Sequence, residues 1–275
     1  MAFDYMPYIR EAKMPHMWCP GCGIGTIMKS MIRAFTDLEW APEDLAVVSG
    51  IGCTSRLPGY LNANTLHTTH GRALSFATGI KMHCPDKHVV VISGDGDGSA
   101  IGGNHLIHAA RRNIDITVII NNNNIYGMTG GQYSPTTPLG AKAATAPYGN
   151  LEPSFDLVKL VQGAGASFVA RAQVGNGKQI SQMLKKAFAH KGMSFVEIVS
   201  NCHTQFGRRN KMADPMNMVN WINDRAVPLK KFDGMSEDDQ AKHFPVGVMH
   251  EDTGRTEYTE TYEKLIAKLR DRRSA

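Results

Sequence analysis

Five short and almost continuously apolar runs limit most strongly what this chain can fold into. They are rich in Val and Ile, as in HVVVIS and DITVII. Such runs are typical of strands that are covered on both faces of a parallel sheet. Segments with a helical spacing of apolar residues lie between them, which predicts an α/β fold with a doubly wound, mostly parallel sheet. The predicted strands are 44–50, 88–94, 115–121, 167–172 and 194–200, and the predicted helices are 24–35, 71–83, 99–112, 154–163 and 177–190.

Two segments interrupt this alternation of strands and helices. Residues 121–153 are rich in Gly, Pro and Thr and are longer than an ordinary connection, which favours a functional loop. Residues 201–255 are also irregular and precede a last helix near 256–271. We therefore predict one domain over residues 1–230 and a C-terminal extension over 231–275, which packs on this domain or on a partner.

Composition excludes several classes of protein. With 275 residues, 42% of them hydrophobic, the chain is large enough to bury a full core. Its longest apolar runs are far shorter than the roughly 20 residues that span a bilayer, and its first residues carry charges of both signs, unlike a secretion signal. The net charge of +5 is spread over scattered basic residues rather than a nucleic-acid track. We predict a cytoplasmic protein with no membrane segment and no nucleic-acid partner.

Glycine and polar residues follow the predicted strands. The segments after the first, second, third and last strands are IGCTSR, DGDGSA, NNNIYGMTGG and NCHTQFGRRN. In a parallel sheet all strands end at the same edge, and ligands bind beyond that edge. The sequence therefore predicts a site at the carboxyl edge of the sheet that contains carboxylate, carboxamide and thiol groups.

Two acids, Asp95 and Asp97, lie between glycines directly after the strand 88–94. This arrangement places backbone N–H groups beside a carboxylate, which suits a diphosphate bridged by a hard cation such as Mg²⁺. Asn123 follows the neighbouring strand and offers a carboxamide oxygen to the same ion. Helix capping is the structural alternative, and Asp97 is the more cap-like of the two acids. We therefore predict Asp95 as the metal ligand and Asp97 as its support.

The five cysteines divide into two groups. In a reducing compartment metal ligation is favoured over disulfides. Cys53 and Cys202 follow strands at the ligand edge, whereas Cys84 precedes the strand 88–94, about 20 Å from that edge, and is expected to be buried without a role. The other four cysteines match the number that a structural zinc or a 4Fe–4S cluster requires, and spacing alone does not separate these possibilities. These four are Cys19, Cys22, Cys53 and Cys202.

The segments GDGDGSAIGG and NNNNIYG, each after a strand, resemble the motif of thiamine diphosphate enzymes. The resemblance implies that Asp95, Asn123 and the main-chain carbonyl of Ile125 hold Mg²⁺, and that GMTGGQ folds over the diphosphate. Dinucleotide binding is disfavoured, because no G-x-G-x-x-G turn follows the first strand. A redox-capable neighbour favours an electron-collecting cluster over a structural zinc. The residues implied as cofactor contacts are Cys53, Thr54, His70, Gly94, Asp95, Gly96, Asp97, Asn123, Ile125, Gly127, Met128 and Thr129.

Over residues 10–225 the chain is similar to the beta subunit of the 2-oxoacid:ferredoxin oxidoreductases. This resemblance rests on WCPGCGIG, GIGCTSR, TTHGRA, GDGDGSAIGGNH and YGMTGGQYSPTTP, in this order, and the last is most similar to the 2-oxoglutarate members. It implies reversible oxidative decarboxylation of a 2-oxoacid with coenzyme A to an acyl-CoA and CO₂, with electrons passing to ferredoxin. The ligands of one 4Fe–4S cluster would be Cys19, Cys22, Cys53 and Cys202.

The same resemblance implies a hetero-oligomer, because the glutamate that activates the cofactor belongs to the pyrimidine domain of a partner alpha subunit. The chain has no second thiamine-type half, so it is expected to be inactive alone. It also has no C-x₂-C-x₂-C-x₃-C-P run, which predicts a single cluster. His70 and Arg72 are candidates for catalytic contact with the substrate or cofactor, against the simpler alternatives of a structural histidine and a surface ion pair. Arg208 and Arg209 are candidates for contact with coenzyme A or a partner.

Two other classes remain open from the sequence. A non-redox thiamine diphosphate decarboxylase subunit would explain the magnesium site but would leave four cysteines without a role. A zinc-stabilised binding or regulatory subunit would explain the cysteines but not Asp95 together with Asn123. The iron, sulfide and zinc contents of the purified protein separate these possibilities.

Overall fold

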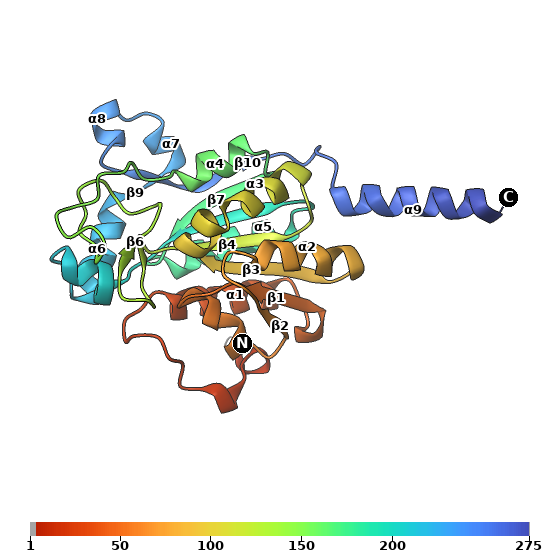
Figure 1. Cartoon of the computed structure of the whole chain (residues 1–275), viewed down its shortest axis with the longest axis horizontal. Helices are drawn as coiled ribbons and strands as arrows, with labels where there is room; N and C mark the ends of the chain where they lie inside the picture. Colours follow the sequence, from red (N-terminus) through yellow and green to blue (C-terminus); the bar gives the residue numbers. More distant parts are fainter. Residues whose placement is uncertain (1–3, 275) are drawn as a thin grey trace.

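An eight-stranded sheet organises the molecule, in the strand order β2-β1-β3-β4-β8-β7-β10-β9 (Figure 1). The structure is a computed structural model that describes residues 4–274. The strands from β2 to β7 in this order are parallel, whereas β10 is antiparallel to β7. The predicted α/β fold with a mostly parallel sheet is therefore confirmed. The strands are β1 (Leu45–Ser49), β2 (Asn64–His67), β3 (His88–Gly94), β4 (Thr117–Asn122), β7 (Phe168–Gln173), β8 (Ser194–Val199), β9 (Ala226–Pro228) and β10 (Phe244–Glu251), with β5 (Ile125–Tyr126) and β6 (Gln132–Tyr133) in a separate hairpin.

Helices cover both faces of the sheet, and the strand side chains alternate between two cores. Val47 and Ile92 pack in a core with the helices α1 and α5, whereas Val48 and Val91 pack with α2, α3 and α4. Because both faces are covered, the central strands are apolar at nearly every position, which is the pattern that made them predictable. The helices are α1 (Ile24–Asp37), α2 (Ala73–His83), α3 (Gly103–Arg112), α4 (Leu157–Gly163), α5 (Gly177–Ala189), α6 (Pro215–Arg225), α7 (Leu229–Phe232), α8 (Glu237–Gln240) and α9 (Tyr258–Ser274).

Three strands of the eight-stranded sheet are not predicted by the apolar pattern. Strand β2 lies at the edge of the sheet and is mostly exposed, so its sequence NTLH is not an apolar run. Strands β9 and β10 lie in the segment 201–255, which the sequence predicts to be irregular. Because β10 pairs with β7, part of the predicted C-terminal extension belongs to the main sheet. The division at residue 230 stays a prediction.

The helix predicted over 99–112 starts later than expected. Residues Asp97–Ile101 form a π-helical turn, and α3 begins only at Gly103. The hydroxyl of Ser99 donates a hydrogen bond to the carbonyl of Asp95, and Gly102 lies close to the backbone of Gly71. Wide turns of this kind occur often at functional sites. Here Asp95 lies directly after β3, and Asp97 is the first residue of the turn.

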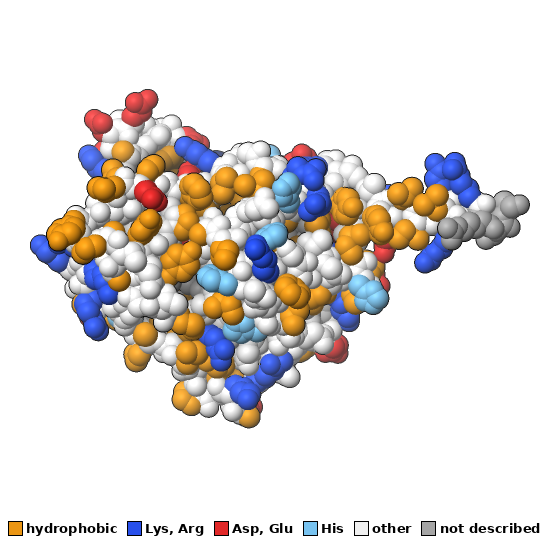
Figure 2. Space-filling model, in the orientation of Figure 1, with side chains coloured by type: hydrophobic (Ala, Val, Ile, Leu, Met, Phe, Trp, Pro, Cys, Tyr) orange, Lys and Arg blue, Asp and Glu red, His pale blue; other side chains and the backbone are white. Residues whose placement is uncertain are grey.

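The C-terminal helix α9 projects away from the rest of the molecule (Figure 1). Its start is anchored by Glu257, a buried residue whose carboxylate accepts hydrogen bonds from the backbone N–H groups of Asp115, Thr259 and Glu260. Hydrophobic side chains lie along the projecting helix (Figure 2). No helix in the described part of the chain is both long and apolar enough to cross a membrane.

Candidate active site

A cavity at the carboxyl edge of the sheet brings the predicted cofactor residues together. It has an empty volume of about 530 Å³, including the part open to solvent. Residues that follow three neighbouring strands, β1, β3 and β4, line it, as parallel topology requires. All twelve predicted cofactor contacts are among its lining residues, together with Ile51, Gly52 and Tyr126, which the sequence analysis did not include.

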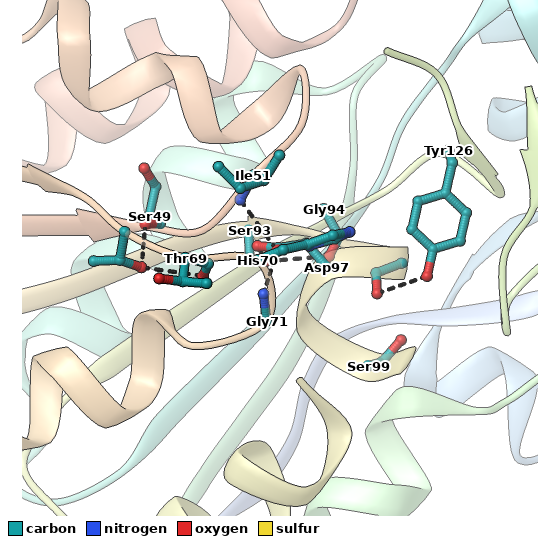
Figure 3. Close-up of polar contacts among 12 residues, drawn as sticks. Ser49, Ile51, Thr69, His70, Gly71, Ser93, Gly94, Asp97, Ser99 and Tyr126 are labelled. Carbon is teal, nitrogen blue, oxygen red and sulfur yellow. Dashed lines mark hydrogen bonds and ion pairs between the residues drawn. The ribbon is translucent and has the colours of Figure 1, made fainter. Parts of the chain in front are cut away.

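Asp97 joins three segments beneath this cavity (Figure 3). Its Oδ1 accepts hydrogen bonds from the backbone N–H groups of Ile51 and Gly71, at 3.1 and 2.7 Å, and contacts Nδ1 of His70 at 2.5 Å. Its Oδ2 accepts a hydrogen bond of 2.5 Å from the hydroxyl of Ser93. The side chain makes no helix-capping hydrogen bond, so the interpretation of Asp97 as the cap-like acid is wrong. The carboxylate is instead shared between segments that are distant in sequence.

Asp95 is buried at the end of β3, and its carboxylate is held from one side. The hydroxyls of Ser134 and Thr136 both donate to Oδ2, each at 2.6 Å. Burial raises the pKa of this carboxyl to about 6, although the two hydroxyl hydrogen bonds favour the charged form and act in the opposite direction. A cation bound beside this carboxylate would stabilise its charged form, because the cation replaces the hydration that is lost on burial. Ser134 and Thr136 lie in the Gly-, Pro- and Thr-rich loop, but no sequence signal identified these two hydroxyls.

Asn123 presents an oxygen without a partner to the same cavity. Its Oδ1 is buried and accepts no hydrogen bond from the described residues. Buried polar atoms are nearly always paired. Other carboxamide oxygens of the described residues are also unpaired, but Asn123 is the one of these asparagines that lines the cavity with Asp95, which points to a ligand at this position. The next residue, Asn124, has a positive φ of 62°, and its carbonyl accepts a hydrogen bond from Thr137. The orphaned oxygen, the carboxylate of Asp95 and the backbone at Ile125 therefore form an oxygen-rich set that fits Mg²⁺.

A buried ion pair under the sheet edge supports the Asn123 turn, and the sequence analysis did not identify it. The guanidinium of Arg171 contacts Glu197 at 2.6 Å and Asp156 at 2.7 Å. The other oxygen of Glu197 accepts a hydrogen bond of 2.7 Å from the side-chain amide of Asn122. Because Oδ1 of Asn122 in turn accepts a hydrogen bond from the N–H of Asn124, the ion pair orients the turn that presents Asn123.

The four predicted cysteine ligands lie together beside the cavity. The thiols of Cys19 and Cys202 each lie 3.8 Å from the hydroxyl of Thr204. A Cβ atom added to Gly127 would lie 3.3 Å from the sulfur of Cys202 and 3.8 Å from that of Cys53. Gly127 and Cys53 also line the cavity, so the thiols and the cavity are contiguous.

Burial controls the protonation of these thiols. It raises the pKa of Cys22 to about 12 and that of Cys53 to about 11, and the neighbouring cysteines add to both shifts. All five cysteines are free thiols. Cys84 lies at the end of α2, before β3 and outside this group, but it is half-buried rather than buried as expected. Among the described residues, no three His, Cys, Asp or Glu side chains are grouped so that they could hold a single metal ion.

The two predicted catalytic residues differ in their positions. His70 lines the cavity, and its ring meets the ring of Tyr126 edge-on with centroids 6.2 Å apart. Arg72 is not among the lining residues, and its guanidinium contacts the ring of His105 on α3 at 2.6 Å. The positive φ of 69° at Gly71 reverses the chain between the two residues and separates their side chains. The structure therefore places His70, but not Arg72, at the cavity.

Of the two arginines predicted to contact coenzyme A or a partner, Arg209 has contacts within the chain. Arg209 donates hydrogen bonds to Gln205 and to the carbonyl of Gly130, which ties the segment after β8 to the glycine turn over the cavity. Gly130 and Gly131 both have positive φ, and the N–H of Gly131 donates to the carbonyl of Tyr126. Arg209 is thus a structural contact of this turn, and a role of Arg208 stays a prediction.

Comparisons with known proteins agree with this geometry. The family described as thiamine pyrophosphate enzyme, C-terminal TPP binding domain, matches residues 50–198. The chain is 50% identical to the 2-oxoglutarate synthase subunit KorB of Methanocaldococcus jannaschii, over 96% of this chain and 98% of that protein. It is 51% identical to the subunit of the same name from Archaeoglobus fulgidus, over 78% of this chain and 79% of that protein.

A solved structure is similar in fold over nearly the whole chain. It is the 2-oxoglutarate:ferredoxin oxidoreductase from Magnetococcus marinus with 2-oxoglutarate, coenzyme A and succinyl-CoA bound. The TM-score is 0.86 at 33% sequence identity, and the similarity covers 97% of this chain and 91% of that chain. Because the similarity covers 97% of this chain, the likeness in fold extends into the segment after residue 230.

Proposed function

The chain belongs to the beta subunits of the 2-oxoacid:ferredoxin oxidoreductases, and from this premise we propose that it carries the diphosphate half of a 2-oxoglutarate-oxidising enzyme. The reaction converts the 2-oxoacid and coenzyme A to an acyl-CoA and CO₂, reduces ferredoxin and is reversible. One observation carries this proposal. The orphaned oxygen of Asn123 and the buried carboxylate of Asp95 share a cavity with Gly127, which lies against the thiols of Cys53 and Cys202.

In the proposed enzyme, Asp95, Asn123 and the carbonyl of Ile125 bind Mg²⁺ and thereby the diphosphate. Thiamine diphosphate, when bound, supplies a carbon nucleophile and an electron sink for decarboxylation. Asp97 holds the loops after β1 and before α2 in place around the cofactor. His70 lies where a histidine can contact the cofactor or the substrate. These side chains bind and orient; the residue that activates the cofactor belongs to the alpha subunit.

Cys19, Cys22, Cys53 and Cys202 are the proposed ligands of one 4Fe–4S cluster. Such a cluster supplies one-electron transfer when it is bound. A tetrahedral zinc would draw four sulfurs to about 2.3 Å from one metal atom, whereas a four-iron cluster keeps its ligands further apart. The thiols of Cys53 and Cys202 lie against Gly127 of the cavity, where a cluster could collect electrons from a redox-capable cofactor, and this supports the cluster rather than zinc. The proposed location is the cytoplasm, where thiols stay reduced.

Anaerobic reconstitution tests the proposal. The chain is assembled with its alpha subunit, iron, sulfide, Mg²⁺ and thiamine diphosphate, and 2-oxoglutarate is added with coenzyme A. We expect visible absorption and an electron paramagnetic resonance signal of one reduced 4Fe–4S cluster, and reduction of methyl viologen that needs both substrates. Pyruvate, assayed in parallel, is expected to react with a lower kcat/KM. Stoichiometric zinc in a colourless protein would support the regulatory alternative, and turnover by this chain alone would contradict the need for a partner.

A further inference from the structure

The parallel helices α1 and α5 form a groove on one face of the molecule, which we call the α1–α5 groove. Its empty volume is about 1200 Å³, including open solvent. Four of its lining residues are basic and exposed, namely Lys29 and Arg33 on α1 and Lys178 and Lys185 on α5. Asp37 is the acid among the lining residues. The groove thus carries a net charge of 4 − 1 = +3, compared with +5 for the whole chain.

Most of this charge is not neutralised within the chain. Arg33 pairs with Asp37 at 3.2 Å, one helical turn away. Lys29, Lys178 and Lys185 form no ion pair with any residue in the range 4–274. Three neighbouring ammonium groups repel one another in a shared groove, and an anionic partner removes this repulsion. The hydrophobic side of both helices is already buried in the core, so their outer side is available for binding.

One end of the groove lies four residues after Cys22 in the sequence. Helix α1 starts at Ile24, two residues after Cys22, and Thr26 in its first turn lines the groove. The start of α1 lies against the carboxyl ends of β7 and β8, because a Cβ on Gly23 would meet Val174 and Ser200. Helix α5 follows β7 and therefore starts at the same edge. A molecule seated in the groove thus has one end beside the four thiols.

The thiol group reaches the surface at this end. Cys19 is exposed, whereas Cys22, Cys53 and Cys202 are half-buried. Electron transfer between two proteins requires that their redox groups approach closely, so the carrier must dock where the cluster is nearest the surface. The N-terminal ends of two helices add partial positive charge at the same place.

We propose that the α1–α5 groove is the docking surface for the acidic electron-carrier protein of the reaction, a ferredoxin of net negative charge. This inference rests on the proposed function, because that function supplies both the cluster and the carrier. Each docking transfers one electron, so two dockings serve each turnover. The C–C bond to the carboxylate breaks and a C–S bond forms, so that one 2-oxoacid, one coenzyme A thiol and two oxidised carriers give one acyl-CoA, one CO₂, one proton and two reduced carriers.

The experiment uses the assembled enzyme with its alpha subunit and the triple variant Lys29→Glu, Lys178→Glu, Lys185→Glu. Charge complementarity mainly determines encounter rate and salt dependence, so we expect the KM for ferredoxin to rise at least about tenfold. The triple variant changes the groove charge from +3 to −3, so kcat/KM for the acidic carrier should rise with ionic strength instead of falling. Reduction of methyl viologen, a small dye that needs no protein docking surface, should stay within about twofold. A matched control, Lys230→Glu, Lys231→Glu, Lys268→Glu, changes the net charge equally outside the groove.

A binding measurement separates this proposal from the proposed function. Titration of the assembled enzyme with ferredoxin in a calorimeter should show binding that the groove variant weakens about tenfold and the control variant leaves unchanged. An unchanged ferredoxin KM and affinity in the groove variant would overturn the docking surface, while viologen-linked turnover would leave the proposed function intact. If the unmutated enzyme shows no 2-oxoacid-dependent viologen reduction, the proposed function fails, and the titration still decides whether the groove binds an acidic protein.

Discussion

The diphosphate cavity and the cysteine group are neighbours, yet the chain prepares them in opposite ways. In the cavity, the hydroxyls of Ser134 and Thr136 hold the carboxylate of Asp95 in place. The buried carboxamide oxygen of Asn123 has no hydrogen-bond partner among the described residues and is free to bind a ligand. In the cysteine group, burial raises the pKa of Cys22 and Cys53, so that these thiols stay protonated without a cluster. The comparison teaches that the Asp95–Asn123 site is organised by the protein, whereas the thiols of the cysteine group would take their charged form only with the proposed cluster bound.

The largest effect is expected from a substitution in the cysteine group alone. Cys202→Ser should remove the cluster signal and lower 2-oxoglutarate-dependent turnover by more than about 100-fold, because a serine hydroxyl is a poor ligand for iron. Iron and sulfide analysis and the electron paramagnetic resonance spectrum measure the loss. Thiamine diphosphate binding should stay within about threefold, since the Asp95–Asn123 site is prepared independently. Cys84→Ser, outside the group, is the control and should keep full iron content.

The second prediction concerns a substitution in the Asp95–Asn123 site alone. Asp95→Asn removes the negative ligand, so Mg²⁺-dependent binding of thiamine diphosphate should weaken by about 100-fold in calorimetry, with an unchanged cluster spectrum. The pKa of this carboxyl is raised to about 6, above its ordinary value, so the burial of its charge destabilises the metal-free fold increasingly as the pH rises from about 4 through 6. The metal-free variant should therefore unfold at a higher temperature than the parent chain at pH 7, and at a similar one at pH 4. A lower unfolding temperature at pH 7 would contradict this account.

A smaller effect tests the support beneath Asn123. Glu197→Gln leaves the guanidinium of Arg171 with Asp156 as its one charged partner, which should lower the free energy of unfolding by about 2 kcal/mol. Because Glu197 also orients Asn122, the affinity for Mg²⁺–thiamine diphosphate should fall about tenfold. Asp156→Asn is the matched control, since it breaks the other contact of Arg171 without touching Asn122. It should reduce stability but leave cofactor affinity unchanged; equal losses of affinity in both variants would exclude the positioning role.

The smallest effect is expected where the two sites meet. Gly127→Ala places a methyl group 3.3 Å from the sulfur of Cys202, which is a tight contact that the cysteine must relieve by a small shift. We expect the cluster spectrum and the cofactor affinity to change together, each by about two- to fivefold or less. Gly79→Ala on α2, where an added Cβ meets no atom within 4 Å, should change neither. A change in only one of the two sites would show that they are less coupled than their geometry indicates.

Much of the fold was predictable because its determinants are local. Each central strand is apolar on both sides, so a run such as 88–94 identifies β3 without knowledge of its neighbours. The exposed edge strand β2 gives no such signal, and β10 pairs with β7 from about 80 residues away in sequence. The site followed from topology, since parallel strands must end at one edge. The outward position of Arg72 did not, because it depends on the turn at Gly71.

The sequence by itself determined which chemical groups gather at the edge of the sheet: the acids after β3, the asparagines after β4 and the cysteines after β1 and β8. Their order along the chain and the parallel topology are sufficient for that conclusion. Only the tertiary structure decided how each group is used. In the folded chain, Asp97 accepts hydrogen bonds from three separate segments, and the carboxamide oxygen of Asn123 has no partner among the described residues. Glu197 accepts a hydrogen bond from Asn122, which is 75 residues away in sequence. The physical reason is that hydrogen bonds and ion pairs between distant segments depend on distances of a few tenths of an ångström, which no local pattern of residue types encodes.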